Sequence, residues 1–104
     1  MTATDLTVAR TILEQLGGQR FVAMTGARKF IGAANSLSFR LPRASQGINV
    51  VRVILTPADT YDVEFLRVRA GEVTPVETCD GVYCDQLQDI FQGATGLATR
   101  FLED

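Results

Sequence analysis

The sequence predicts one α+β domain, in which an antiparallel meander sheet of four or five strands carries an N-terminal and a C-terminal helix on one face. Three observations lead to this prediction. Apolar residues repeat at helical spacing near both ends of the chain, and between residues 20 and 76 they alternate with polar ones. The length of 104 residues is typical of one domain, so residues 1–104 are expected to form a single compact unit. A hydrophobic content of 46% is sufficient for a core.

Residues 4–16 are expected to form the first helix, because apolar residues three and four positions apart give one continuous stripe. Thr4 is the expected N-cap, and Asp5 lies in the first turn, where a negative charge is favourable. Gly17 follows as the residue that closes the helix.

The first strands are short. Residues 21–25 are a short apolar run that ends at Gly26, and residues 29–31 are expected to form a second short strand that ends at Gly32. Residues 37–41 alternate most clearly. Residues 49–55 place apolar side chains on both sides of the expected strand, which predicts a central strand covered on both faces.

The later strands carry two special features. In residues 61–69, apolar and polar side chains alternate up to Phe65, and beyond it the side of the sheet that the apolar side chains face becomes ambiguous. A β-bulge near Phe65 and Leu66 would turn all of the apolar side chains toward the core. Residues 73–79 contain Pro75 and are expected to form an edge strand, because proline cannot donate to a neighbouring strand.

The second helix is expected to begin at Asp80 and to end at Gly96. Apolar residues alternate at 97–102, a pattern compatible with a short final strand. One apolar stripe supports the helix, formed by Tyr83, Leu87, Ile90, Phe91 and Ala94.

The composition argues against an enzyme. The chain has no histidine, and the glycines match neither a phosphate-binding loop nor a dinucleotide fingerprint. Two cysteines, Cys79 and Cys84, are too few for a disulfide scaffold or for a zinc site within one chain, which leaves open only a zinc site shared between two copies. The carboxylates Asp59, Asp62 and Glu64 are interpreted as a solvated strand face rather than an acid–base pair or a Mg²⁺ site. We therefore predict no catalytic residue, metal, cofactor or small-molecule substrate.

The N-terminal residues lack the basic and apolar regions of a secretory signal, and no apolar run approaches the length that spans a bilayer. A cytoplasmic protein without a membrane partner is expected.

The net charge of −2 conceals a strong segregation of charge. Residues 19–70 carry eight cations and three carboxylates, whereas residues 71–104 carry one arginine and seven carboxylates. One hypothesis is that the basic sheet and the acidic C-terminal segment pair with each other, within one chain or between subunits. The domain is then expected to be an interaction module that binds a protein partner or a second copy of itself, as in a homodimer. The alternative is that a basic sheet face binds single-stranded nucleic acid. The residues assigned to that alternative are Arg28, Lys29, Phe30, Arg40, Arg43, Arg52, Tyr61, Arg67 and Arg69.

Four stretches of the chain resemble a family of small proteins of bacteriophages, prophages and related mobile elements that have no assigned activity. They are LEQLGG at 13–18, FVAMTGA at 21–27, YDVEF at 61–65 and ATGL at 94–97. The resemblance implies a mobile-element setting and a location in the host cytoplasm. It also implies an accessory role, in which a non-catalytic module binds a host or defence protein.

Overall fold

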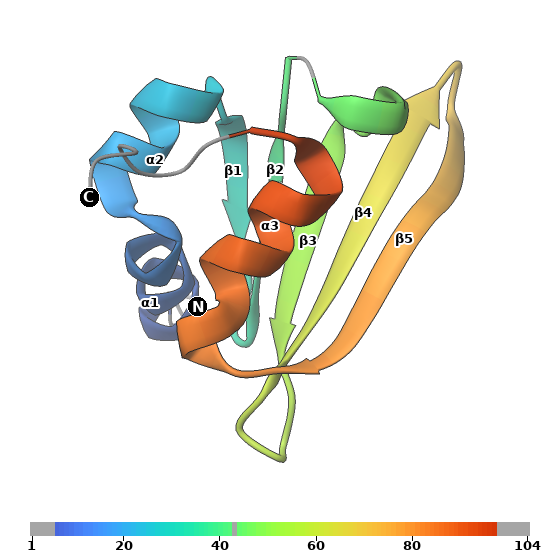
Figure 1. The fold of residues 1–104 in the computed structure, drawn as a ribbon. Coiled ribbons are helices and arrows are strands. Elements are labelled where there is room, and N and C mark those ends of the chain that lie inside the picture. Colours follow the sequence, from blue (N-terminus) through green and yellow to red (C-terminus); the bar gives the residue numbers. More distant parts are fainter. Residues whose placement is uncertain (1–5, 43, 98–104) are drawn as a thin grey trace, which may run out of the picture.

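The structure is a computed structural model that describes residues 6–42 and 44–97. Five strands pair in sequence order, each antiparallel to the next, and the helices lie on one face of the sheet (Figure 1). This arrangement confirms the predicted α+β meander. The elements are α1 (Thr7–Leu16), α2 (Gly18–Thr25), β1 (Arg28–Gly32), β2 (Ser36–Arg40), the 3₁₀ turn η1 (Ser45–Gly47), β3 (Val50–Leu55), β4 (Tyr61–Arg69), β5 (Glu72–Val82), the 3₁₀ turn η2 (Cys84–Gln86) and α3 (Leu87–Thr95).

The core lies between the sheet and the helices. Phe21 of α2 meets Phe39 of β2 and Phe91 of α3, with ring centroids 5.4 and 5.1 Å apart in edge-to-face geometry. Alternate residues of the central strands point into the same layer, so Val51 and Phe65 are fully buried. The aromatic cluster therefore joins both layers of the fold.

Residues 21–25 form helix α2 and not a strand, so this sequence prediction was wrong. Phe21 and Thr25 are four residues apart and both are buried, as one side of a helix requires. The hydroxyl of Thr25 donates to the carbonyl of Phe21 at 2.8 Å. A short apolar run fits either a strand or a helix, and here the contacts of Phe21 with the other aromatic rings decide between them.

The two ends of the chain also differ from the prediction. Helix α1 begins at Thr7, and the expected cap residues Thr4 and Asp5 lie outside the described residues. Asp80 belongs to β5, which continues to Val82, and a 3₁₀ turn precedes α3. The strand pairing of Tyr61 with Val82 keeps this part of the chain extended.

Gly96 adopts a left-handed conformation at the end of α3, as predicted. Beyond Leu97, the final strand considered for 97–102 lies outside the described residues.

The predicted bulge is present, but its extra residue lies in the other strand. The register passes from the pair Phe65 and Glu77 to the pair Leu66 and Pro75, which leaves Val76 of β5 as the additional residue. The alternation of β4 therefore continues unbroken, and Leu66 and Val68 point away from the helices rather than inward. β5 is the edge strand that Pro75 predicted.

Strand β3 is central in the sheet, as predicted, but only one of its faces is covered. Val51 and Val53 are buried beneath the helices, whereas Val50 and Ile54 are half-buried and Arg52 is exposed on the other side. The three helices cover a single face (Figure 1), so the opposite side of the sheet stays open. Within residues 6–42 and 44–97, no helix combines the length and apolar character that a membrane crossing needs.

Candidate interaction surface

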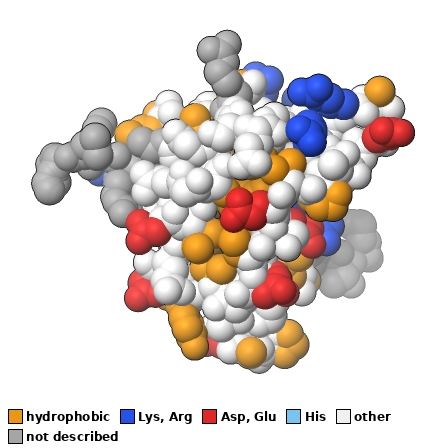
Figure 2. Space-filling model, turned by 45° about the vertical axis from the view of Figure 1, so that its right-hand side comes forward, with side chains coloured by type: hydrophobic (Ala, Val, Ile, Leu, Met, Phe, Trp, Pro, Cys, Tyr) orange, Lys and Arg blue, Asp and Glu red, His pale blue; other side chains and the backbone are white. Residues whose placement is uncertain are grey.

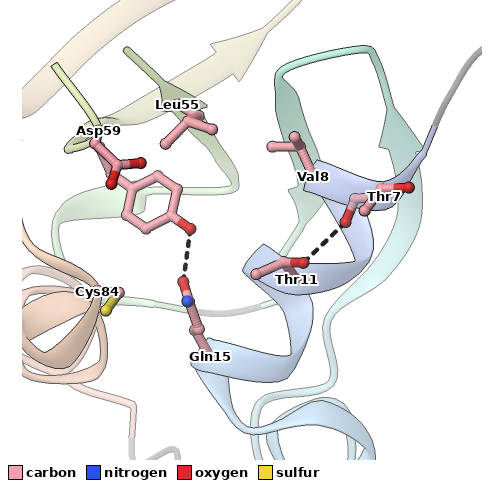
Figure 3. A pocket seen from close by; sticks show the side chains of 8 residues that line it. Thr7, Val8, Thr11, Gln15, Leu55, Asp59 and Cys84 are labelled. Carbon is pink, nitrogen blue, oxygen red and sulfur yellow. Dashed lines mark hydrogen bonds between the residues drawn. The ribbon is translucent and has the colours of Figure 1, made fainter. Parts of the chain in front are cut away.

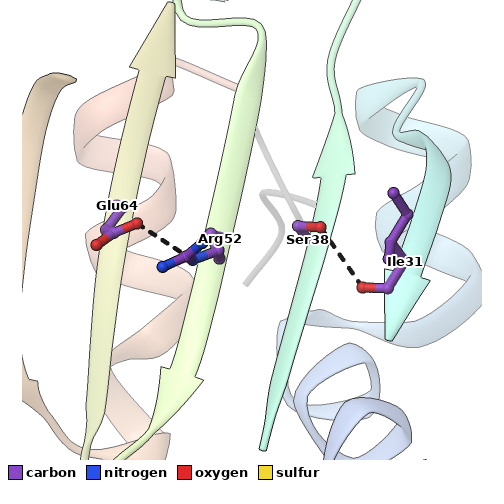
Figure 4. Close-up of polar contacts among 4 residues, drawn as sticks. All are labelled: Ile31, Ser38, Arg52 and Glu64. Atoms are coloured by element: carbon purple, nitrogen blue, oxygen red, sulfur yellow. Dashed lines mark hydrogen bonds and ion pairs between the residues drawn. The ribbon is translucent and has the colours of Figure 1, made fainter. Parts of the chain in front are cut away.

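The sheet side that faces away from the helices is called the open face below. Figure 4 shows side chains from β2, β3 and β4 on this side, with the helices behind the strands. Part of it forms a shallow hollow of about 420 Å³. The outward residues of the open face include Lys29, Ile31, Ser36, Ser38, Arg40, Val50, Arg52, Ile54, Asp62, Glu64, Leu66, Val68 and Val73.

The strand register arranges these residues in rows across the sheet. One row holds Arg40, Val50 and Leu66. The next row holds Ser38, Arg52 and Glu64. The third holds Ser36, Ile54 and Asp62. Cations thus gather at the β1–β2 side of one end, and carboxylates gather on β4 toward the other end.

The apolar part of the open face lies beside the cations. Val50 and Leu66 are cross-strand partners on β3 and β4, and Val68 faces Val73 of β5. Val73 is 59% exposed and Ile31 on β1 is 68% exposed. An outward face of an antiparallel sheet is ordinarily polar, so this group of aliphatic side chains is unusual for a solvated surface.

One ion pair marks the middle of the open face (Figure 4). Arg52 Nε lies 3.2 Å from Glu64 Oε1, with both side chains partly exposed. Such a surface pair contributes about 0–1 kcal/mol, so it orients the two side chains more than it stabilises the fold. On the neighbouring strands the hydroxyl of Ser38 donates to the carbonyl of Ile31 at 3.5 Å.

The structure brings most of the predicted basic residues to one end of the sheet, because β1 begins where β2 and β4 end (Figure 1). Arg28 pairs with Arg40 across β1 and β2. Arg67 and Arg69 lie beside η1 on the helix side, where Arg67 Nη1 donates to the carbonyl of Gln46 at 3.0 Å. Figure 2 shows a group of Lys and Arg side chains at the upper end of the molecule, with most Asp and Glu side chains below it.

Only part of the predicted basic set shares the open face. Lys29, Arg40 and Arg52 lie on it. Arg43 lies outside the described residues.

Neither predicted aromatic residue lies on the open face, which corrects the proposed stacking surface. Phe30 lines a groove against α1 together with Leu6 and Leu13. Tyr61 is only 5% exposed, on the helix side, and its hydroxyl donates to Gln15 Oε1 at 2.6 Å. Successive residues of a strand point to opposite sides of the sheet, and this alternation directs both Phe30 and Tyr61 to the helix side. The cations of the open face therefore alternate with aliphatic side chains rather than with rings.

A second hollow, of about 290 Å³, lies on the helix side around Tyr61 (Figure 3). It is lined by residues of α1, of the β3–β4 turn and of η2, including Thr11, Asp59 and Cys84. Burial, followed by the nearby charges of Cys84 and Asp59, raises the pKa of Tyr61 above its usual value. The phenol acts as the hydrogen-bond donor to Gln15. No spacing in the sequence indicated this hollow, because its residues come from distant segments.

The three carboxylates that were considered for acid–base chemistry have different surroundings. Asp59 lies in the β3–β4 turn beside Tyr61. Asp62 accepts a hydrogen bond from the backbone N–H of Gly81 at 3.3 Å, and Glu64 pairs with Arg52. In the part of the chain that the structure describes, no three Asp, Glu, Cys or His side chains are grouped so that they could hold a metal ion.

Both cysteines are free thiols. Cys79 is half-buried and its Sγ donates to Glu77 Oε2 at 3.6 Å. Burial, followed by the charge of Glu77, raises the pKa of the Cys79 thiol. Cys84 is exposed.

The fold and surface together define an α+β domain whose sheet has one helix-covered face and one open face. No family model, curated protein sequence or solved structure matches the chain. The resemblance to mobile-element proteins thus stays a prediction.

Proposed function

We propose that this protein is a non-catalytic interaction module whose open face binds a protein partner or a second copy of the chain. The observation that carries the proposal is the group of outward aliphatic side chains on β3, β4 and β5. The hydrophobic core does not include Val50, Leu66 or Val73. Burial of these side chains in a complex would remove apolar surface from water. A group of neighbouring exposed aliphatic side chains favours a protein interaction site.

The charges around this apolar group also favour a protein partner. Lys29 and Arg40 flank it, and neither has an acidic partner among the described residues. Charged groups at the rim of an interface accelerate association and select the partner. The resemblance noted above leads us to propose a host or defence protein as one such partner, in the host cytoplasm.

The substitution Leu66→Glu tests the proposal, because it places a charge in the middle of the apolar group. The matched control is Ala23→Glu, which adds the same charge at an exposed position of α2 on the helix side. Both variants are compared with the wild type in quantitative capture from host lysate and in sizing experiments, after circular dichroism has verified the fold. We expect association in the wild type and the control and its loss in Leu66→Glu. Equal association of all three proteins would refute the open face as the binding site.

Single-stranded nucleic acid is a second candidate ligand, favoured by the cations at one end of the sheet, among them Arg28, Arg40 and Arg69. An electrostatic groove of this kind binds most tightly at low salt. The absence of rings from the open face among the described residues removes the stacking contribution of about 1–3 kcal/mol per base. Fluorescence anisotropy with a labelled oligonucleotide at low salt tests this candidate, and absence of binding there would refute it.

A further inference from the structure

The distribution of charge over the open face identifies one occupant. This step rests on the proposed function. We propose that a second copy of the chain covers the open face, related to the first by a two-fold axis that runs diagonally across the face. The axis passes from the corner at the β1–β2 turn to the corner at the β4–β5 turn. The two sheets then pack face to face with their strands crossing at a large angle.

The four corners of the open face differ in character. Lys29 and Arg40 form a basic corner, where β1 begins and β2 ends. Asp62 and Glu64 form an acidic corner, diagonally opposite on the first half of β4. The two corners on the other diagonal carry no charged side chain of the open face.

The remaining diagonal carries apolar side chains at both of its ends. Val68 and Val73 lie at the corner of the β4–β5 turn. Ile31 lies beside the corner of the β1–β2 turn, and Ile54 lies in the row next to that turn. Leu66 lies between these ends, close to the diagonal, and so does Arg52, whose charge is paired with Glu64 of its own chain.

A two-fold contact requires a self-complementary surface, because each patch meets the same surface of the other copy. Rotation about the apolar diagonal places each basic corner over the acidic corner of the other copy and each apolar corner over itself. Rotation about the charged diagonal stacks cations on cations. Rotation about an axis along the strands, or across them, places the basic corner over an uncharged one. Only the apolar diagonal pairs opposite charges, and it gives the orthogonal packing known for sheet pairs.

The charges on the basic corner have no acidic partner within the described part of their own chain. In the proposed dimer Arg40 approaches Asp62 and Glu64 of the other copy, and this contact occurs twice by symmetry. Opposite charges at the two corners would select this arrangement over the like-charged one, since juxtaposed like charges disfavour association strongly.

A charge-exchange experiment tests the arrangement. Arg40→Glu and Asp62→Lys are made singly and combined in one chain, and association is measured by sedimentation velocity over a range of concentrations. Each single variant alone places like charges together, so its dimerisation is expected to weaken at least about tenfold. A mixture of the two single variants pairs Glu with Lys and Arg with Asp across the interface. The mixture, and likewise the double variant, is expected to recover association.

The substitution Asp62→Asn is the matched control for local structure, because it removes the charge and keeps an oxygen that can accept the N–H of Gly81. Its effect is expected to lie between those of the wild type and Asp62→Lys. Circular dichroism and urea unfolding verify that each variant is folded.

Two results would overturn the inference: a wild type that stays monomeric up to about 1 mM, the Kd of a very weak complex, or single variants whose mixture does not regain association. Either result leaves the proposed function intact if Leu66→Glu still abolishes capture of another protein. If Leu66→Glu has no effect on any association, the proposed function fails as well. Loss in both single variants with recovery in the mixture supports the diagonal dimer.

Discussion

Replacing Phe21 by alanine should remove more stability than any other change on α2. The ring is 0% exposed and makes edge-to-face contacts with Phe39 and Phe91, at interplanar angles of 78° and 72°. Truncation of a fully buried phenylalanine costs about 3–5 kcal/mol, which already includes the lost contacts and the cavity. A domain of this size is stable by about 5–15 kcal/mol, so the variant loses a large part of its free energy of unfolding.

Phe21→Leu separates the ring contacts from simple burial. It keeps most of the apolar volume but removes two aromatic pairs, each contributing about 0.5–1.5 kcal/mol, so we expect a loss of about 1–3 kcal/mol. Phe30→Leu is the control, because this ring is partly exposed and tilted against Phe39 at 5.4 Å. Urea unfolding followed by circular dichroism measures all three variants. A loss below about 1 kcal/mol for Phe21→Ala would show that the ring does not join α2 to the sheet and α3.

Three further predictions concern single groups. Because burial and neighbouring negative charges raise the pKa of Tyr61 above 10.0, the folded state holds the phenol proton more tightly than the unfolded state. This contribution to stability is complete below about pH 10 and is lost as the pH rises through the folded pKa; Tyr61→Phe should flatten that part of the pH profile of unfolding, and identical profiles would contradict the assignment. Cys79, whose pKa is raised by burial and an adjacent carboxylate, should be alkylated more slowly at pH 8 than the exposed Cys84, and mass spectrometry of partly labelled protein compares the two rates. Gly47 has φ +74°, so Gly47→Ala should cost about 1–2 kcal/mol, whereas Gly93→Ala in open space on α3 should stabilise by about 0.5–1 kcal/mol; equal effects in urea unfolding would refute this.

The meander could be predicted because its signals are local. The alternation around Leu37 and Phe39 identified β2, and Pro75 identified the edge strand. Residues 21–25 could not be assigned in this way, because a run of five residues fits both the helical period and the strand period. The contacts that decide between them are made with residues far along the chain.

The charged residues of the candidate surface could be predicted from the sequence, but the side of the sheet that each of them faces could not. The sequence placed a bulge near Phe65 and Leu66, and the bulge is there. One strand read alone does not reveal which of two paired strands holds the extra residue. That residue is Val76 of β5, so Leu66 remains on the open face. The sequence alone therefore did not show that Leu66, the central apolar residue of the candidate site, points to the open face.

The edges of the sheet explain why association should use its face. β5 carries Pro75, two register shifts and several carboxylates, and each of these features opposes the addition of another strand. β1 is short and is interrupted by a register shift, with Lys29 in a left-handed conformation. Edge pairing between copies is thus disfavoured on both sides. The open face, with its aliphatic side chains and opposite charged corners, is the part of the sheet on which no such feature opposes contact with a second copy.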